Sequence, residues 1–405
     1  MSVFSRYGEV LRPPGARTAL LASLGGRVSI AMNGLALLLL VRQATGSYAS
    51  AGVVSACYSV ALAVAQPMRA RAADRRGPTP VLRTCAVLHP LAFVLLVLLT
   101  SAHAPVVVDA AAAVGIGATV PPIGGVMRAL WAQLIEPALH PVAYSLDAVL
   151  VELCFVTGPL LVALVAATAS PTVAVLVSSA IGGVAAVVLS SVSVVRATAA
   201  TDSRPSHLLG PLVSPVVRVS LLVVLFIGAS FGAIEVGVLA FVAEHGHSRS
   251  VAGTVLAVWA LGSALGGLAY AAARVRAPAS RQLPPLAALA GAAGALPLLA
   301  PNVPVLAALV LVAGSTIAPW NGVNSVVVGH AAPAGTTTEA FAWFSTLIFT
   351  GGSAGTALSG VLADAHGSTG AFVVSAGSGA LAVVAAGVAV RVMKAHESDP
   401  AHVAF

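Results

Sequence analysis

Four ionisable side chains lie inside long apolar stretches of the sequence: Arg27, Asp147, Glu152 and Glu235. If these stretches cross a bilayer, each charged group costs about 2.5 to 3.5 kcal/mol to insert, so each requires a partner or a water-filled cavity. Glu235 has no obvious basic partner in its own half of the chain. Because a buried, unpartnered carboxyl favours its neutral form, Glu235 is the candidate for proton coupling; the alternative is a neutral, hydrogen-bonded structural acid.

The composition indicates a membrane environment for these groups. Of the 405 residues, 58% are hydrophobic and 8% are charged, with a mean hydropathy of +0.99. An ordinary soluble domain has about 25% charged residues, so this composition predicts a multi-pass membrane protein. The net charge of +7 does not indicate nucleic-acid binding, because the basic residues lie at the ends of apolar segments.

Several classes of chemistry are excluded by residue type and spacing. Cys57, Cys85 and Cys154 occur singly, without a CxxC pair, so we expect no metal site, disulfide framework or other cofactor site. The only lysine is Lys394, so no G-x-x-x-x-G-K-[ST] loop exists for ATP hydrolysis. Ser353 lies in a G-x-S-x-G sequence, but within an apolar helix instead of a strand-to-helix turn, so an enzyme is not expected.

The apolar segments predict an all-α membrane protein. A helix needs about 20 residues to cross the hydrocarbon, and twelve segments qualify, near 18–41, 48–68, 80–101, 105–128, 142–168, 172–195, 218–242, 251–273, 283–301, 303–329, 338–363 and 369–392. The longest polar break divides the chain into an N-terminal six-helix bundle (1–195), a linker (196–217) and a C-terminal six-helix bundle (218–405). Thr336 and Glu339 form a T-x-x-E capping box that predicts the start of the eleventh span.

The basic residues predict the orientation in the membrane. With both termini and the linker in the cytoplasm, seventeen of the twenty basic residues lie on the inner side; Arg42 and Arg249 lie outside, and Arg27 lies within a span. This asymmetry follows the positive-inside rule. We therefore expect a multi-pass protein of the plasma (inner) membrane with both termini cytoplasmic.

The two halves carry an internal repeat. A shift of 197 places 117–126 on 314–323, with five of the ten positions identical, including Gly117 on Gly314 and Pro122 on Pro319. An even number of spans separates the copies, so they have the same orientation. This pattern predicts two bundles related by a pseudo-twofold axis along the membrane normal.

Two parallel six-helix halves joined by a linker resemble the major facilitator superfamily (MFS) of secondary transporters. The sequence Ala73-Asp74-Arg75-Arg76-Gly77 after the second span is similar to the signature G-x-x-x-D-[RK]-x-G-[RK]-[RK] of that family, with Asp74, Arg75 and Gly77 matching. Ala70, Pro78 and Thr79 depart from it. Gly158-Pro159 in the fifth span is similar to the G-x-x-x-G-P-x-x-G motif of the exporters, with Cys154 and Val162 at the flanking glycine positions.

The resemblance implies roles for the charged residues. Asp74 and Arg75 would form a gate that closes the inner face by a contact with a neighbouring helix end; the alternative is a solvated turn. The family places its first and fifth helices side by side. Arg27 and Glu152 both lie about 14 to 15 Å from the inner surface at 1.5 Å per residue, so we expect them to pair.

A second ion pair is expected one turn nearer the inner surface, between Arg128 and Asp147. Either pair could act in gating or substrate binding, or could only hold the N-terminal bundle together.

The resemblance also implies a central cavity lined by helices one, four, seven and ten. The candidates for its wall are Arg27, Asn33, Trp320, Asn321 and Asn324. The alternative for the neutral residues is hydrogen bonding between helices, worth about 0.6 kcal/mol each.

The resemblance therefore implies a secondary active transporter, which we expect to move a small organic solute across the plasma membrane by alternating access. Gly158-Pro159 and a cavity with few fixed charges favour efflux, and Glu235 as the candidate for proton coupling would make the protein an antiporter. The alternatives are proton-coupled uptake of a metabolite and a non-transporting receptor or scaffold on the same fold. The expected partners are the solute, protons and the lipid bilayer, with the protein a monomer.

Overall fold

The computed structural model describes residues 3–198, 209–273, 275 and 277–397, and all secondary structure in these residues is helical. The α-helices are α1 (Val3–Val10), α2 (Ala16–Thr45), α3 (Tyr48–Arg76), α4 (Pro78–Ser101), α5 (Val106–Thr119), α6 (Ile123–Leu134), α7 (His140–Thr168), α8 (Pro171–Ser191), α9 (Ser193–Ala197), α10 (Pro215–Glu244), α11 (Arg249–Ala273), α12 (Ala279–Ala293), α13 (Val303–Gly314), α14 (Ile317–Ala331) and α15 (Thr337–Glu397). Short 3-10 turns occupy η1 (Pro137–Leu139), η2 (Gly210–Val213) and η3 (Leu296–Leu299). Of the predicted linker, residues 199–208 lie outside the described part.

Twelve helical segments are long and apolar enough to cross a membrane, as the sequence predicts. Eleven continuous candidate spans are present in the described residues, and the last one covers two crossings. Gly367 interrupts α15 with φ 64° and ψ −158°, a conformation that a residue with a side chain rarely adopts, and so divides α15 into two helices. Large apolar side chains such as Leu98 and Leu164 are exposed on the outer surface, as expected for lipid contact.

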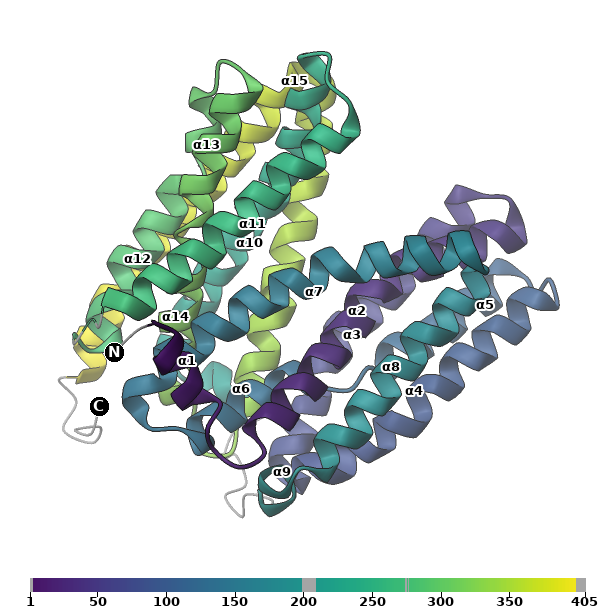
Figure 1. The fold of residues 1–405 in the computed structure, drawn as a ribbon, viewed down its shortest axis with the longest axis horizontal. Coiled ribbons are helices and arrows are strands. Elements are labelled where there is room, and N and C mark those ends of the chain that lie inside the picture. Colours follow the sequence, from purple (N-terminus) through teal and green to yellow (C-terminus); the bar gives the residue numbers. More distant parts are fainter. Residues whose placement is uncertain (1–2, 199–208, 274, 276, 398–405) are drawn as a thin grey trace.

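The helices form two groups (Figure 1). The N-half contains α2 to α8 and the C-half contains α10 to α15. The two halves meet where α6, α7 and α14 lie, and their far ends diverge (Figure 1). We call the end where α6 ends and α15 begins the closed end, and the opposite end the open end.

Two spans are broken at nearby places in the two halves, two to three residues apart under the repeat shift of 197. The fourth span divides into α5 and α6 at Val120–Pro122, and the tenth divides into α13 and α14 at Ser315–Thr316. Both breaks lie inside the segments that the sequence repeat aligned. Arg69 donates hydrogen bonds to the carbonyls of Gly117 and Ala118, so a guanidinium compensates the last carbonyls of α5.

Close packing within the C-half depends on glycine. Gly232 of α10 faces the carbonyl oxygen of Gly352 of α15, and an ideal Cβ at Gly232 would lie 2.1 Å from that oxygen. The backbones of α10 and α15 therefore approach closely, in the manner of small-residue helix pairs in membranes.

Candidate functional site

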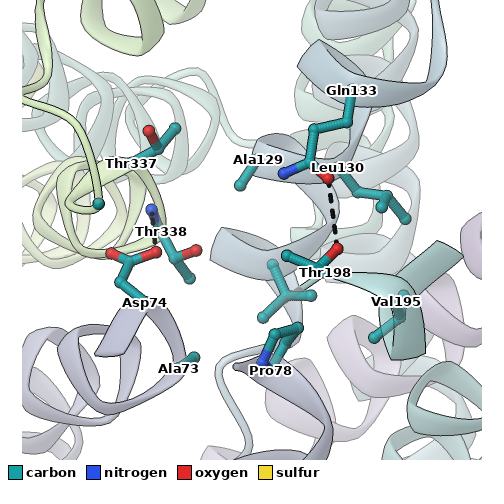
Figure 2. Close-up of a pocket in the computed structure, with 12 residues that line it drawn as sticks. Ala73, Asp74, Pro78, Ala129, Leu130, Gln133, Val195, Thr198, Thr337 and Thr338 are labelled. Carbon is teal, nitrogen blue, oxygen red and sulfur yellow. Dashed lines mark hydrogen bonds between the residues drawn. The ribbon is translucent and has the colours of Figure 1, made fainter. Parts of the chain in front are cut away.

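The closed end is held by a carboxylate of the N-half that caps a helix of the C-half. Asp74, near the end of α3, accepts hydrogen bonds from the backbone N–H groups of Thr338 (3.1 Å) and Glu339 (2.9 Å) in the first turn of α15. Figure 2 shows Asp74 pointing at Thr338 across the boundary between the halves. A carboxylate is favourable here because the first N–H groups of a helix are unpaired and carry partial positive charge. Gly77 follows with φ 81° and ψ 151° and forms the junction between α3 and α4.

The predicted capping box at the start of α15 is wrong. Thr336 uses its hydroxyl to bond the carbonyl of Pro333, and the N–H of Glu339 goes to Asp74. A cap from the other half of the molecule thus replaces the local one. Because this cap exists only while the halves touch at the closed end, it links the two halves directly.

Glu339 itself forms a second link between the halves. Its carboxylate accepts from Arg71 Nε at 2.7 Å and from Arg71 Nη2 at 2.5 Å, a bidentate ion pair in which Glu339 is 1% exposed. Arg71 has no signal in the sequence that predicts this role, since only the fold brings α3 to the start of α15. Arg75, which the resemblance placed in the gate, is exposed and forms no ion pair within the described residues.

A pocket of about 180 Å³ lies beside the Asp74 cap (Figure 2). Its wall comes from the end of α3, the start of α4, α6, α9 with Thr198 after it, and the start of α15 with Gly335 before it. Across it, Thr198 donates to Gln133 Oε1 at 3.3 Å. Any separation of the halves at the closed end would widen this space.

A cluster of three charged side chains lies inside the N-half, next to the C-half. Asp147 of α7 accepts from Arg128 Nε through Oδ2 at 3.0 Å and pairs with Arg27 Nη1 through Oδ1 at 2.7 Å. The pair between Arg128 and Asp147 is the one that the sequence predicts. The predicted pair between Arg27 and Glu152 is wrong, because Asp147 and Glu152 are five residues apart and so point in directions about 140° apart on α7. We call Arg27, Arg128 and Asp147 the charge cluster.

Arg128 also contacts the C-half. Its Nη2 donates to Asn321 Oδ1 at 3.4 Å, and its guanidinium carbon lies 4.7 Å from the centroid of the Phe344 ring. Phe344 in turn stacks on Trp320 at 6.3 Å between centroids. The charge cluster is therefore joined to α14 and α15 by a hydrogen bond and a cation–π contact.

Glu152 lies at the boundary between the halves on the other side of α7. Ser263 of α11 donates to Glu152 Oε1 at 2.8 Å, and Oε2 is buried without a hydrogen-bond partner among the described residues. No basic side chain in the described residues pairs with this carboxyl. Glu152 thus lacks a basic partner, which is the property that the sequence predicts for Glu235.

Glu235 is exposed, not buried as expected from its apolar surroundings. Four residues before it, Phe231 contacts Trp259 of α11. Three residues before it, Gly232 contacts α15. Helix geometry therefore places Glu235 on the strip of α10 between α11 and α15. The opposite side of α10, at Gly237, packs on the Phe372 ring.

Of the remaining residues predicted for the cavity and for helix packing, Asn33, Asn324 and Gly158 are buried between helices. Asn33 is fully buried in the N-half, where its amide donates to Tyr58 and accepts from Ser178, so it acts as a link between helices. Asn324 is fully buried in the C-half, and neither polar atom of its amide has a partner. Gly158 packs against Ala31 of α2, and a Cβ added at Gly158 would lie 2.6 Å from the Cβ of Ala31. Pro159 follows Gly158 inside α7.

Within the described residues, no group of three His, Cys, Asp or Glu side chains could hold a metal ion. The contacts of the site described above include ion pairs and hydrogen bonds that cap a helix.

Comparisons with known proteins agree with this geometry. The model of the Major Facilitator Superfamily matches residues 19–283. A search of curated proteins found no match.

Three solved structures share the fold. The human organic anion transporter MFSD10 (TETRAN) is 18% identical, with a TM-score of 0.69, and the match covers 93% of this chain and 100% of that one. A bacterial homologue of the iron transporter ferroportin in the outward-facing state is 12% identical, with a TM-score of 0.74 over 93% and 99% of the two chains. The MFS transporter FucP in the outward conformation is 15% identical, with a TM-score of 0.67 over 92% and 98%.

Proposed function

Because the chain belongs to the Major Facilitator Superfamily, we propose that it exports a small organic solute in exchange for protons, by alternating access between its two halves. The observation that carries this proposal is the closed end. There, Asp74 caps α15 and Arg71 pairs with Glu339, and both contacts join the N-half to the C-half. A membrane transporter needs such contacts to break in one stage of its cycle and re-form in the next.

The described conformation corresponds to an outward-facing stage, with the closed end toward the cytoplasm. This assignment is supported by the divergence of the far ends in Figure 1 and by the outward conformations of two structures with the same fold. It also agrees with the positive-inside rule, which supports cytoplasmic termini. We propose that the membrane is the plasma membrane. Opening toward the cytoplasm then requires loss of the Asp74 cap and of the pair between Arg71 and Glu339.

Glu152 is the carboxyl best suited to carry the coupled proton. It lies between α7 and α11, on the boundary that must move, and it has one hydrogen bond and no basic partner. An ionised carboxylate left in this position when the halves separate would be costly unless water reaches it, so proton uptake and release would follow the movement. Glu235, on the strip between α11 and α15, is the second candidate.

Export is favoured over uptake by Gly158-Pro159, which resembles the motif of exporters and packs α7 closely on α2 at Ala31. The solved structures with the same fold are described as transporters of different substrates: an organic anion, iron, and fucose together with a proton. The similarity of fold therefore does not identify the substrate of this chain. We propose that the transporting unit is a monomer, since one chain supplies both halves.

The test uses purified protein in liposomes of one known orientation, loaded with a panel of small organic solutes. We expect a subset of solutes to leave faster than from protein-free liposomes, and a pH gradient to accelerate that loss. Acceleration only in the opposite direction would establish the alternative of uptake. If no solute leaves faster under any gradient, the chain is a receptor or scaffold and the proposal is overturned.

Glu152→Gln tests the coupling separately from transport. The variant should retain exchange of the solute at equal pH but lose the acceleration by a pH gradient, with Glu235→Gln measured in parallel. Full proton-driven transport by Glu152→Gln would overturn its role, and loss only in Glu235→Gln would assign the proton to the second candidate.

A further inference from the structure

The charge cluster has an uncompensated positive charge. Arg27 and Arg128 are each 6% exposed and Asp147 is 0% exposed. Asp147 is the only acid that forms an ion pair with either arginine among the described residues. Two cations and one anion leave a net charge of +1 in a place with little access to water, where an unbalanced charge is costly.

The same region has buried donors without acceptors. Arg128 Nη1 has no hydrogen-bond partner, although Nε and Nη2 of the same guanidinium are both bonded. Trp320 Nε1 and Asn324 Nδ2, both on α14, are also buried without partners. Arg128 contacts Asn321 of α14, and around the same helix Asn324 lies about 60° and Trp320 about 100° from Asn321.

These two observations point to the same kind of ligand. An excess positive charge beside N–H donors that have no acceptors suits an anion, because the anion balances the charge and accepts the free hydrogen bonds. A carboxylate matches the planar guanidinium fork of arginine. A single negative charge gives a neutral cluster, whereas two would leave it negative.

We propose that the charge cluster binds the carboxylate of a monoanionic organic substrate, between the arginines and the α14 face that carries Trp320 and Asn324. This inference rests on the proposed function and narrows its substrate to a small carboxylic acid in its ionised form. The Phe344 ring lies beside the guanidinium and the Trp320 ring stacks on Phe344, so both rings would contact the apolar body of the substrate.

Binding there also connects the substrate to the movement of the halves. Arg128 contacts Asn321 and Phe344 of the C-half in the described conformation. When the halves separate at the closed end, Arg128 loses these contacts, and Asp147 remains the one acid among the described residues that pairs with Arg128 and with Arg27. A bound carboxylate replaces the lost acceptor, so it lowers the cost of separation for the loaded protein.

The experiment measures direct binding to the purified full-length protein by calorimetry and by the shift in Tm. The probes are benzoate, which is a monoanion with an apolar ring, benzamide, which is its uncharged analogue, and phthalate, which is a dianion. We expect benzoate to bind and to raise Tm, phthalate to bind more weakly, and benzamide not to bind. Equal binding of benzoate and benzamide, or no binding of benzoate, would overturn the inference.

Two charge variants should change binding in opposite directions. Arg128→Gln removes the excess charge and a charged donor, so the dissociation constant for benzoate should rise by about 10- to 150-fold. Asp147→Asn increases the net charge of the cluster to +2, and the dissociation constant should fall by about tenfold. A purely structural cluster would weaken binding in both variants, and that result would contradict the proposal.

The controls separate folding and transport from binding. Arg218→Gln removes an exposed arginine of α10 and should leave benzoate binding unchanged. If Arg128→Gln or Asp147→Asn does not fold, Arg128→Lys keeps the charge without the planar fork and should bind benzoate only several-fold more weakly. Transport of neutral solutes without benzoate binding would overturn this inference alone, whereas benzoate binding without any solute flux would overturn the proposed function alone.

Discussion

Removing the Asp74 carboxylate should shift the protein from the outward-facing to the inward-facing conformation. In Asp74→Ala, the N–H groups of Thr338 and Glu339 lose both of their acceptors across the halves. An N-cap contributes about 0.5 to 2 kcal/mol, and a carboxylate at a partly buried helix N-terminus contributes up to about 2 kcal/mol. Since the two effects overlap, we expect a loss of about 2 to 3 kcal/mol.

This free energy corresponds to a change of about 30- to 150-fold in the ratio of outward-facing to inward-facing protein. A ratio of about 99:1 would fall to between about 3:1 and slightly below 1:1. The effect is therefore large enough to be seen as a change in populations, and not only as a change in rate.

The assay measures the distance between two spin labels at the open end, by pulsed electron paramagnetic resonance. Ser101→Cys at the end of α4 and His247→Cys after α10 place the labels on exposed positions of the two halves. The native cysteines are replaced first: Cys57, Cys85 and Cys154. Asp74→Ala should transfer population from the long distance to a shorter one.

Arg75→Ala is the matched control, because Arg75 is adjacent in sequence, exposed and outside the ion pairs. It should leave the distance distribution unchanged. If Asp74→Ala and Arg75→Ala give the same distribution as the parent protein, the Asp74 cap does not stabilise the closed end and the reasoning is refuted.

Three further predictions concern the contacts around the gate and within the halves. Arg71→Gln and Glu339→Gln should each raise the inward-facing population in the same distance measurement. In a double-mutant cycle, the coupling free energy between the two substitutions should be about 0.5 to 3 kcal/mol. Additive effects of the two substitutions would contradict the ion pair. Asp147→Asn should lower the free energy of unfolding by about 3 to 5 kcal/mol, seen as a lower Tm, because it leaves two buried arginines without their carboxylate; an unchanged Tm would show that the arginines are hydrated. Gly232→Ala should cost about 1 to 3 kcal/mol or more, since its Cβ would meet the Gly352 carbonyl, whereas Gly253→Ala, where an added Cβ meets nothing within 4 Å, should leave Tm nearly unchanged.

The fold could be predicted from the sequence because its signals are local. Long apolar runs predict the twelve crossings. Glycine and proline in register predict equivalent segments in the two halves, and both segments contain a helix break, two to three residues apart under the repeat shift. Arg128 and Asp147 were also predictable, because their depths agree within one helical turn.

The partners at the boundary between the halves could not be predicted from depth and local motifs. Depth alone does not distinguish Asp147 from Glu152 for Arg27, since the direction of each side chain around α7 decides the partner. The local T-x-x-E pattern also gave no sign that Asp74, 265 positions away from Glu339, would take over the cap. Burial of Glu235 was inferred from apolar neighbours in sequence, but its exposure depends on which helices pack on each side of α10.

Locking the closed end tests the account most directly. Arg71→Cys and Glu339→Cys place one thiol on each half at the positions of the ion pair, and a short bifunctional thiol reagent can join them in protein whose native cysteines have been replaced. In oriented liposomes, the account predicts that the cross-linked protein transports no solute and that reduction of the cross-link restores the flux of the unlinked variant. Solute flux at the unlinked rate while the cross-link is intact would contradict it, because the halves would then not need to separate at this end.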